Sequence, residues 1–364
     1  MSVGVSLSDS SLQPRAVVEE GTSYVIPGRP ESIDLPLGNT ERVIVSREEQ
    51  KEFREIVSQL DVGTIISYPK AFGLQQHLAD RFNVLPAQVL VTGGADEALE
   101  RAIGCVLEPG RELIATSPTF EMIPIYARLT GGAVHQIPWL EGSFPVSEIL
   151  EAVTDRTTVI SVVTPANPTG ALIALGDLQR IARAAPQILL IVDLAYVEFA
   201  DVDITPDLLA EPNVLIVRSL SKAWGMPGAR VGYALGSAEV IDWMSRTSGP
   251  YSVSGPSLAI AQARLQYGRE NVRNYVRTVR AEREHLIELI KELGGIPMPS
   301  QANFVLARFE DVVEVSDRLA DRGIGTRRFP GNPDLQDFLR ITCPGDQEAF
   351  QRLTGALKAA VRKT

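Results

Sequence analysis

The chain contains few of the residues from which disulfide frameworks and metal sites are built. Two cysteines, Cys105 and Cys343, and three histidines, His77, His135 and His285, occur among 364 residues. The histidines lie far apart in the sequence, and neither cysteine belongs to a CxxC motif. We therefore expect no metal site and no disulfide framework.

The chain also lacks an excess of positive charge and any long apolar run. Its net charge is -10 and its pI is about 5.0, which argues against nucleic acid or an anionic membrane as a partner. The most apolar run, residues 188–192, ends at Asp193 and is too short to cross a membrane. Residues 1–14 have neither the basic start nor the apolar stretch of a signal peptide. We expect a cytoplasmic protein whose partners are small molecules.

From residue 89 onward, short β-branched runs alternate with amphipathic segments. This alternation predicts an α/β fold with a mostly parallel sheet flanked by helices. The expected strands lie at residues 89–91, 112–115, 133–137, 158–163, 188–192 and 214–217.

The length of the chain predicts more than one domain. We expect an N-terminal arm at residues 1–45, a large domain at 46–250 and a smaller α+β domain at 251–364. At the start of the large domain, Ser46 is expected to cap a helix, and Glu49 to complete a capping box.

The segment Ser219-Leu-Ser-Lys222 is the strongest candidate for a reactive site. It follows an apolar run that is typical of a buried strand, and Arg230 lies eight residues beyond the lysine. A lysine amine condenses with aldehydes, while Ser219, Ser221 and Arg230 could bind a phosphate. The combination suits pyridoxal phosphate, which carries both groups. A lone lysine in a loop would otherwise be a solvated charge.

Two further loops contain polar residues where an expected strand ends. Gly94, Ala95 and Asp96 lie in a glycine turn before a helix, where backbone N–H groups could approach a phosphate. Taken by itself, this stretch is better explained as an ordinary tight turn. Asn167 stands between two prolines, so its amide is held stiffly enough to reach a fixed acceptor, such as the cofactor's phenolic oxygen.

Asp193 ends an apolar strand, where a carboxylate is costly unless a positive group pairs with it. The protonated pyridine nitrogen of the cofactor would be such a partner. An aspartate that caps a helix and faces solvent is the alternative. Tyr196, three residues later, is suitably placed to donate to the ring oxygen.

Five other residues become candidates only because the motifs above already indicate a cofactor site. Phe120 could stack on the cofactor ring, although core packing explains it as well. Tyr68 could donate to a phosphate, and Tyr24, in the N-terminal arm, could reach into a site. Arg327 and Arg340 each end a short expected strand and could together bind a carboxylate or phosphate, with Arg328 competing for the role of Arg327.

Together these motifs resemble the fold type I pyridoxal-phosphate-dependent aminotransferases of class I/II, and most of all the histidinol-phosphate aminotransferases. The resemblance spans nearly the whole chain. Its motifs are Tyr24-x-x-Pro-Gly28, Tyr68-Pro69, Gly94-Ala-Asp-Glu97, Asn167-Pro-Thr-Gly170, Asp193-x-Ala-Tyr196, Ser219-x-Ser-Lys222, Arg230, Gly323-Ile…Arg327 and Leu339-Arg340-Ile.

The resemblance implies the fold, a homodimer, a part in amino-acid biosynthesis and a role for each motif residue. Lys222 would bind the cofactor covalently and later move a proton, Asp193 would bind the pyridine nitrogen, and Asn167 and Tyr196 would bind the ring oxygen. Further implied contacts are Gly94, Ala95, Asp96, Ser219, Ser221 and Arg230 around the cofactor phosphate, Tyr68 from a second subunit, Phe120 over the ring, and Tyr24, Asn167, Arg327 and Arg340 at the substrate.

Three departures from the family pattern bear on the site. The family's Asn-Glu-Asn-Pro stretch reads Leu37-Gly-Asn-Thr-Glu41 here, Phe120 replaces a tyrosine, and Leu194 replaces an acidic residue. The first and third concern the substrate pocket and its surroundings, so they leave transamination intact and the substrate open.

Histidinol phosphate with 2-oxoglutarate is the leading substrate pair. An aminotransferase for aromatic or other amino acids, or a decarboxylase or lyase of the same fold, are the alternatives.

Overall fold

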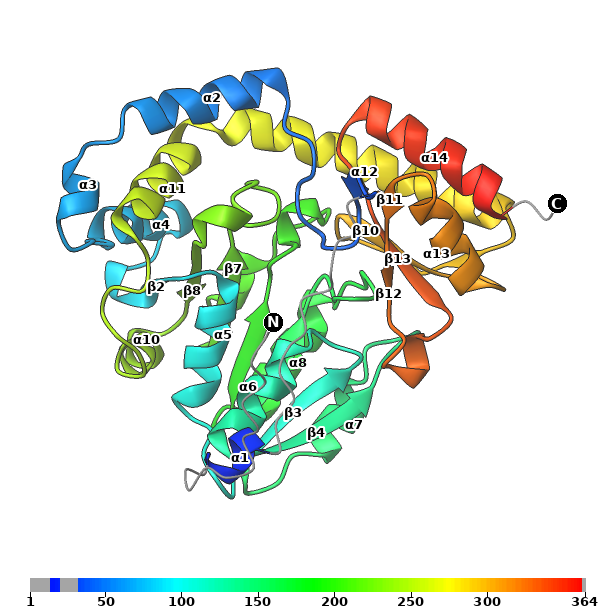
Figure 1. Cartoon of the computed structure of the whole chain (residues 1–364). Coiled ribbons are helices and arrows are strands. Elements are labelled where there is room, and N and C mark those ends of the chain that lie inside the picture. Colours follow the sequence, from blue (N-terminus) through cyan, green and yellow to red (C-terminus); the bar gives the residue numbers. More distant parts are fainter. Residues whose placement is uncertain (1–13, 20–31, 362–364) are drawn as a thin grey trace, which may run out of the picture.

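The computed structural model describes residues 14–19 and 32–361, and a seven-stranded sheet forms its centre (Figure 1). β8 runs antiparallel to both of its neighbours, while the other strand pairs are parallel. The sheet is therefore mostly parallel, as predicted. In order across the sheet, the strands are β2 (Val89–Thr92), β8 (Gly232–Leu235), β7 (Val214–Ser219), β6 (Leu189–Asp193), β5 (Thr157–Val163), β3 (Glu112–Ser117) and β4 (Ala133–Pro138).

Helices cover both faces of this sheet because its central strands carry apolar side chains on both faces. Alternate residues of β6 illustrate this. Leu189 and Ile191 belong to one apolar cluster, with α5 (Ala95–Gly104), α6 (Met122–Thr130) and α10 (Ala238–Ser245). Leu190 and Val192 belong to a second cluster, with α8 (Leu175–Ala184). The strands are thus fixed from both sides, and their carboxyl ends form a rigid edge.

A smaller antiparallel sheet lies in the C-terminal part of the chain. Helices α13 (Val312–Ala320) and α14 (Gln347–Val361) lie beside it (Figure 1). Its strands in order are β12 (Arg327–Arg328), β13 (Phe338–Thr342), β10 (Phe304–Arg308) and β9 (Ile296–Pro297). The division into an arm and two domains near residue 250 remains a prediction.

Two elements connect the N-terminal and C-terminal parts of the described chain. Strand β1 (Leu35–Pro36) pairs in parallel with β11 (Ile324–Gly325), which brings the segment after β1 next to the C-terminal sheet. Helix α12 (Arg269–Glu292) runs from beside α2 (Arg47–Ser58) and α11 (Gly255–Tyr267) to α14 (Figure 1).

The remaining elements are short or lie at the periphery. They are α1 (Ala16–Glu19), α3 (Gly63–Ile66), α4 (Phe72–Phe82), α7 (Val146–Glu151), α9 (Thr205–Leu208), and the 3₁₀ helices η2 (Pro86–Gln88), η3 (Val197–Phe199), η4 (Pro227–Ala229) and η5 (Pro333–Leu335).

The start of α2 differs in part from the expectation. Ser46 caps the helix, because its Oγ accepts the backbone N–H of Glu49 at 3.2 Å. The Glu49 side chain does not complete a capping box. Its buried carboxylate instead accepts from Arg42 Nη1 at 2.5 Å and from Arg264. Two guanidinium partners outweigh one backbone N–H, because hydrogen bonds between charged groups are the stronger ones.

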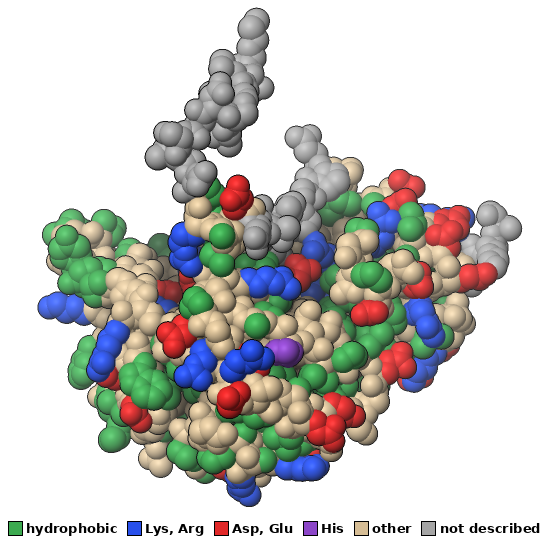
Figure 2. Space-filling model, turned by 90° about the horizontal axis from the view of Figure 1, so that it is seen from below, with side chains coloured by type: hydrophobic (Ala, Val, Ile, Leu, Met, Phe, Trp, Pro, Cys, Tyr) green, Lys and Arg blue, Asp and Glu red, His purple; other side chains and the backbone are tan. Residues whose placement is uncertain are grey.

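The surface is mixed in charge. On the face drawn in Figure 2, acidic and basic side chains are interspersed among apolar ones. None of the described helices combines the length and the apolar character that crossing a membrane requires. Within the described residues, no three His, Cys, Asp or Glu side chains gather as a metal site, and Cys105 and Cys343 are free thiols.

Candidate active site

The carboxyl ends of the parallel strands open into a cavity of about 500 Å³. Asp193 ends β6, Ser219 ends β7, and the loop after β5 carries Asn167. The predicted residues that line the cavity are Ala95, Asp96, Phe120, Asn167, Asp193, Tyr196, Ser219, Ser221, Lys222, Arg230, Arg327 and Arg340.

Asp193 is a buried carboxylate that has no cationic hydrogen-bond partner among the described residues. Its side chain is buried, and one oxygen accepts the backbone N–H of Ala195 at 2.9 Å. Burial raises the pKa of Asp193 to about 7, and the charge of Asp96 adds to the rise, while the Ala195 hydrogen bond and Lys222 oppose it. A cation bound beside Asp193 would therefore be strongly favoured.

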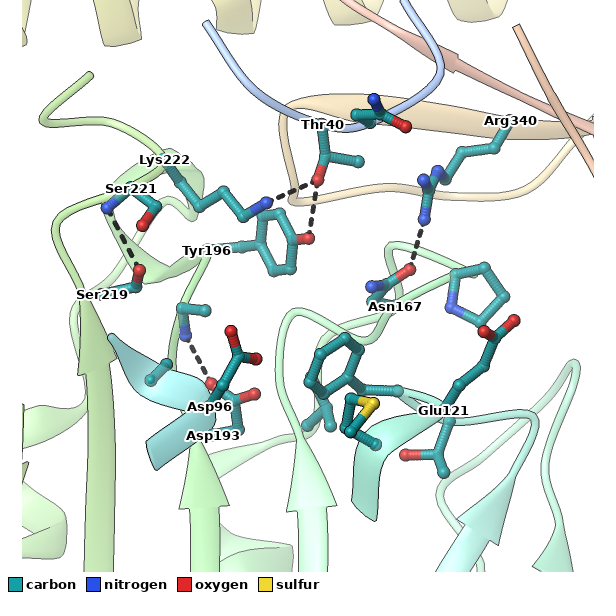
Figure 3. Close-up of a pocket in the computed structure, with 18 of the residues that line it drawn as sticks. Thr40, Asp96, Glu121, Asn167, Asp193, Tyr196, Ser219, Ser221, Lys222 and Arg340 are labelled. Carbon is teal, nitrogen blue, oxygen red and sulfur yellow. Dashed lines mark hydrogen bonds between the residues drawn. The ribbon is translucent and has the colours of Figure 1, made fainter. Parts of the chain in front are cut away.

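The Lys222 amine lies at one end of a short hydrogen-bond chain (Figure 3). Its Nζ donates to Oγ1 of Thr40 at 2.7 Å, and the same hydroxyl is 3.0 Å from Oη of Tyr196. The ammonium also lies 5.4 Å from the centre of the Tyr196 ring. Thr40 thus bridges the lysine predicted to bind the cofactor and the tyrosine predicted to donate to the cofactor's ring oxygen.

Thr40 was not predicted from the sequence. Its side chain is buried and its backbone φ is 56°, a left-handed conformation that β-branched residues rarely adopt. Asn303 Nδ2 holds this conformation by donating to the carbonyl of Thr40 at 3.1 Å. The only signal in the sequence was that the stretch 37–41 departs from the family pattern.

The loop that begins at Lys222 ends near Arg230, which lies beside the start of α5. Together these two segments form a cradle. Gly94 has φ 93°, and a Cβ there would lie 2.5 Å from Nη2 of Arg230, so only glycine fits. Arg230 Nη2 in turn donates to Asp96 at 2.9 Å. The Ser221 N–H donates to Oγ of Ser219 at 3.1 Å. Gly94 supports this cradle from behind rather than lining the cavity.

Two arginines lie at the other side of the cavity, on paired strands. Arg327 of β12 is the direct partner of Arg340 on β13. Arg340 is buried, and it donates to Oδ1 of Asn167 at 2.5 Å and to the carbonyl of Gly38 at 2.7 Å. Arg327 lies 3.8 Å from the carboxylate of Glu121, which the sequence did not single out. Arg327, and not its competitor Arg328, lines the cavity.

Among the described residues, Tyr68 is a predicted site residue that does not reach this cavity. Tyr68 is 77% exposed and stacks on Tyr251, with ring centres 4.7 Å apart. Tyr24 falls outside the described residues, so its predicted place in the site stays a prediction.

The donor set fits the cofactor expected from the sequence. A buried carboxylate with no cationic hydrogen-bond partner in the described part of the chain suits a protonated ring nitrogen, and the cradle of glycine, serines and arginine suits a phosphate. Lys222 and Phe120 line the same cavity as this carboxylate and this cradle.

The chain matches the family described as aminotransferase class I and II over residues 34–357. It is 34% identical to the histidinol-phosphate aminotransferase of Xanthomonas euvesicatoria pv. vesicatoria, across 80% of this chain and 83% of that protein. The same enzyme of Caldanaerobacter subterraneus is 34% identical, with 85% and 88% covered.

Solved structures agree in fold. The histidinol-phosphate aminotransferase of Sinorhizobium meliloti, determined in complex with pyridoxal-5'-phosphate, superposes with a TM-score of 0.84 at 22% identity and covers 98% of this chain and 99% of its own. A Thermus thermophilus aspartate aminotransferase variant gives 0.78 at 23% identity, covering 96% and 99%.

Proposed function

The chain belongs to the class I and II aminotransferases, and we propose that it transfers an amino group between histidinol phosphate and 2-oxoglutarate, as a cytoplasmic homodimer. One observation carries the proposal. Lys222 and Asp193 line a single cavity together with Arg327 and Arg340. The relatives at 34% identity are named for histidinol phosphate, which supports the same substrate here.

Pyridoxal phosphate, when bound, supplies a carbon that bonds to amines and a ring that withdraws electrons from the neighbouring substrate carbon. We propose that Asp193 holds the proton on the ring nitrogen, while Tyr196 and Asn167 orient the ring oxygen. Lys222 anchors the cofactor between turnovers. Once released by the substrate amine, its Nζ would take the proton from the substrate Cα and would deliver it to the cofactor carbon that bonds the amine, which leaves the amino group on the cofactor.

The phosphate of the cofactor is assigned to the cradle at the start of α5. Its ligands in this proposal are the backbone N–H groups of Ala95 and Asp96, the hydroxyls of Ser219 and Ser221, and the Arg230 guanidinium. Phe120 lies against the ring, and it keeps the stacking contact without the hydroxyl of a tyrosine.

Arg340 and Arg327 are assigned to the acidic groups of the substrates. Arg340 is held by Asn167 and Gly38, so its guanidinium is oriented before a substrate arrives. It would bind the α-carboxylate of 2-oxoglutarate or glutamate, and together with Arg327 the phosphate of histidinol phosphate. Tyr24, predicted to add a hydroxyl to that phosphate, belongs to this proposal as well.

A second candidate is an aminotransferase for aromatic or other unphosphorylated amino acids. Glu121 favours it, because a carboxylate 3.8 Å from Arg327 competes with a substrate phosphate for that guanidinium. In this case Arg340 alone would bind the substrate carboxylate.

The two candidates are separated by titrating the holoenzyme with amino donors while its cofactor absorbance is recorded. We expect the absorbance to bleach with histidinol phosphate and to return with 2-oxoglutarate. Bleaching with aromatic amino acids but not with histidinol phosphate would overturn the first candidate. Release of carbon dioxide or ammonia would instead indicate a decarboxylase or a lyase.

The homodimer is supported by the exposed apolar surface around Tyr68. Val62, Ile65, Ile66 and Phe72 are all more than half exposed next to it in sequence, and such a patch is typical of an interface. We propose that Tyr68 crosses to the cofactor phosphate of the partner. Mixing inactive Tyr68→Ala and Lys222→Ala variants should then restore activity, because each hybrid dimer contains one intact site. Monomers at micromolar concentration, or no restoration on mixing, would refute this.

A further inference from the structure

A second cavity, of about 480 Å³, lies between α4 and α12, away from the residues that line the active site. We call it the arginine cavity. Five guanidinium groups line it, together with Trp224, Glu198, Val272 and Val276. The arginines are Arg81 at the end of α4 and Arg269, Arg273, Arg277 and Arg280 along one side of α12.

These arginines have no carboxylate partners among the described residues, although most ion pairs elsewhere in the molecule contain an arginine. Arg269 donates to the carbonyl of Leu265, and Arg280 to that of Phe199 at 3.1 Å. Arg81 lies over the ring of Trp224, 5.1 Å from its centre. None of these contacts neutralises a positive charge.

The one carboxylate in the lining is already balanced. Oε1 of Glu198 accepts from the buried Arg218 at 2.8 Å and from Nε1 of Trp224 at 3.2 Å. Burial lowers the pKa of the neighbouring His77, and the positive charges of Arg269 and Arg81 add to the decrease, while the charge of Asp80 opposes it. Five like charges at one cavity repel one another unless an anion lies between them.

We propose that the arginine cavity binds a small anion with at least two phosphate groups. Guanidinium groups bind phosphate oxygens through two parallel hydrogen bonds, and an anion with two phosphate groups offers one set of oxygens to Arg81 and another to the arginines of α12. The anion would bridge Arg81 on α4 to the arginines of α12, the helix that extends to the C-terminal part (Figure 1). Trp224 lies two residues after Lys222, so the bound anion would also lie behind the catalytic loop.

The test measures pyrophosphate binding to the holoenzyme by isothermal titration calorimetry, with inorganic phosphate at matched ionic strength as the comparison. We expect saturable binding of pyrophosphate that is at least about tenfold tighter than that of phosphate. An Arg273→Gln/Arg277→Gln variant should bind at least about tenfold more weakly, equivalent to about 1.4 kcal/mol.

Two control variants make the outcome specific. Arg128→Gln/Arg180→Gln removes the same charge from α6 and α8, which do not line the cavity, and should bind within about twofold of the unaltered protein. Arg327→Gln tests whether pyrophosphate occupies the active site instead. No saturable binding, binding unchanged by Arg273→Gln/Arg277→Gln, or loss only in Arg327→Gln would each overturn the proposal.

Discussion

The two sides of the active-site cavity are assembled in different ways. On the cofactor side, Asp193 and Ser219 end two neighbouring strands, and Lys222 follows three residues later. On the substrate side, Thr40, Glu121 and Arg327 come from three segments that are far apart in the sequence. The first side is part of one buried sheet, whereas the second exists only when distant segments meet.

Different forces therefore hold the two sides. The sheet is packed on both faces, so the cofactor side is fixed by the core itself. The substrate side depends on single hydrogen bonds between segments, such as Asn303 to Thr40 and Arg340 to Gly38. Substitutions on the cofactor side should therefore lower the rate the most, and those on the substrate side should have smaller effects on affinity, selectivity or rate.

The largest effect is expected from Lys222→Ala. The change removes both the amine that anchors the cofactor and the group that moves the proton, so kcat should fall about 10⁴-fold. Steady-state kinetics measures the loss of kcat. Mass spectrometry after borohydride treatment measures the loss of the covalent bond to the cofactor. Lys358→Ala, on the exposed face of α14, is the matched control. Cofactor still trapped covalently in Lys222→Ala would contradict the assignment.

Asp193→Asn should lower kcat by about 10²–10³-fold, the cost of losing a preorganised charge at the reacting ring. The same substitution should increase the folding stability of the apoprotein at high pH. The folded-state pKa of Asp193 is raised to about 7 from 3.8, so this carboxyl favours folding at low pH, and that contribution is lost as pH rises through about 7.

The Asp193→Asn apoprotein should therefore be more stable than the unaltered apoprotein at pH 8, and its stability should fall less between pH 5 and pH 8. Urea unfolding at the two pH values measures this difference. Asp321→Asn, at an exposed position, controls for the loss of one negative charge. Equal pH dependence in the two apoproteins would show that Asp193 is not the group responsible.

The sequence predicts the cofactor side of the cavity better than the substrate side. The mostly parallel sheet was predicted because its strands are continuous apolar runs. Asp193 was singled out because it directly follows such a run, and Lys222 because serines precede it and Arg230 lies eight residues beyond. Thr40 and Glu121 were missed because their role depends on long-range contacts, which no local pattern encodes. Glu49 was misassigned for the same reason, since its partner Arg264 lies on a distant helix.

On the substrate side, Arg340→Gln should have a larger effect than Arg327→Gln. Arg340 is buried and already bonded to Asn167 and Gly38, so its loss should cost about 10- to 100-fold in kcat/KM for every substrate. Arg327→Gln should cost about tenfold for phosphorylated substrates and little for amino acids without a phosphate. Parallel kinetics with histidinol phosphate and glutamate compare the two. An equal loss of both substrates in Arg327→Gln would contradict its assignment to the phosphate.

The smallest effect is expected from Thr40→Val, which removes the hydroxyl between Lys222 and Tyr196 but keeps the β-branched shape. The released amine would lose one oriented hydrogen bond, so kcat should fall about threefold while KM changes little. A larger kinetic isotope effect with α-deuterated donor should accompany the loss, because proton transfer becomes slower relative to the other steps. Thr40→Ser keeps the hydroxyl and should restore both values. If Thr40→Ser is as slow as Thr40→Val, the strained backbone at this position, and not the hydroxyl, is what the cavity requires.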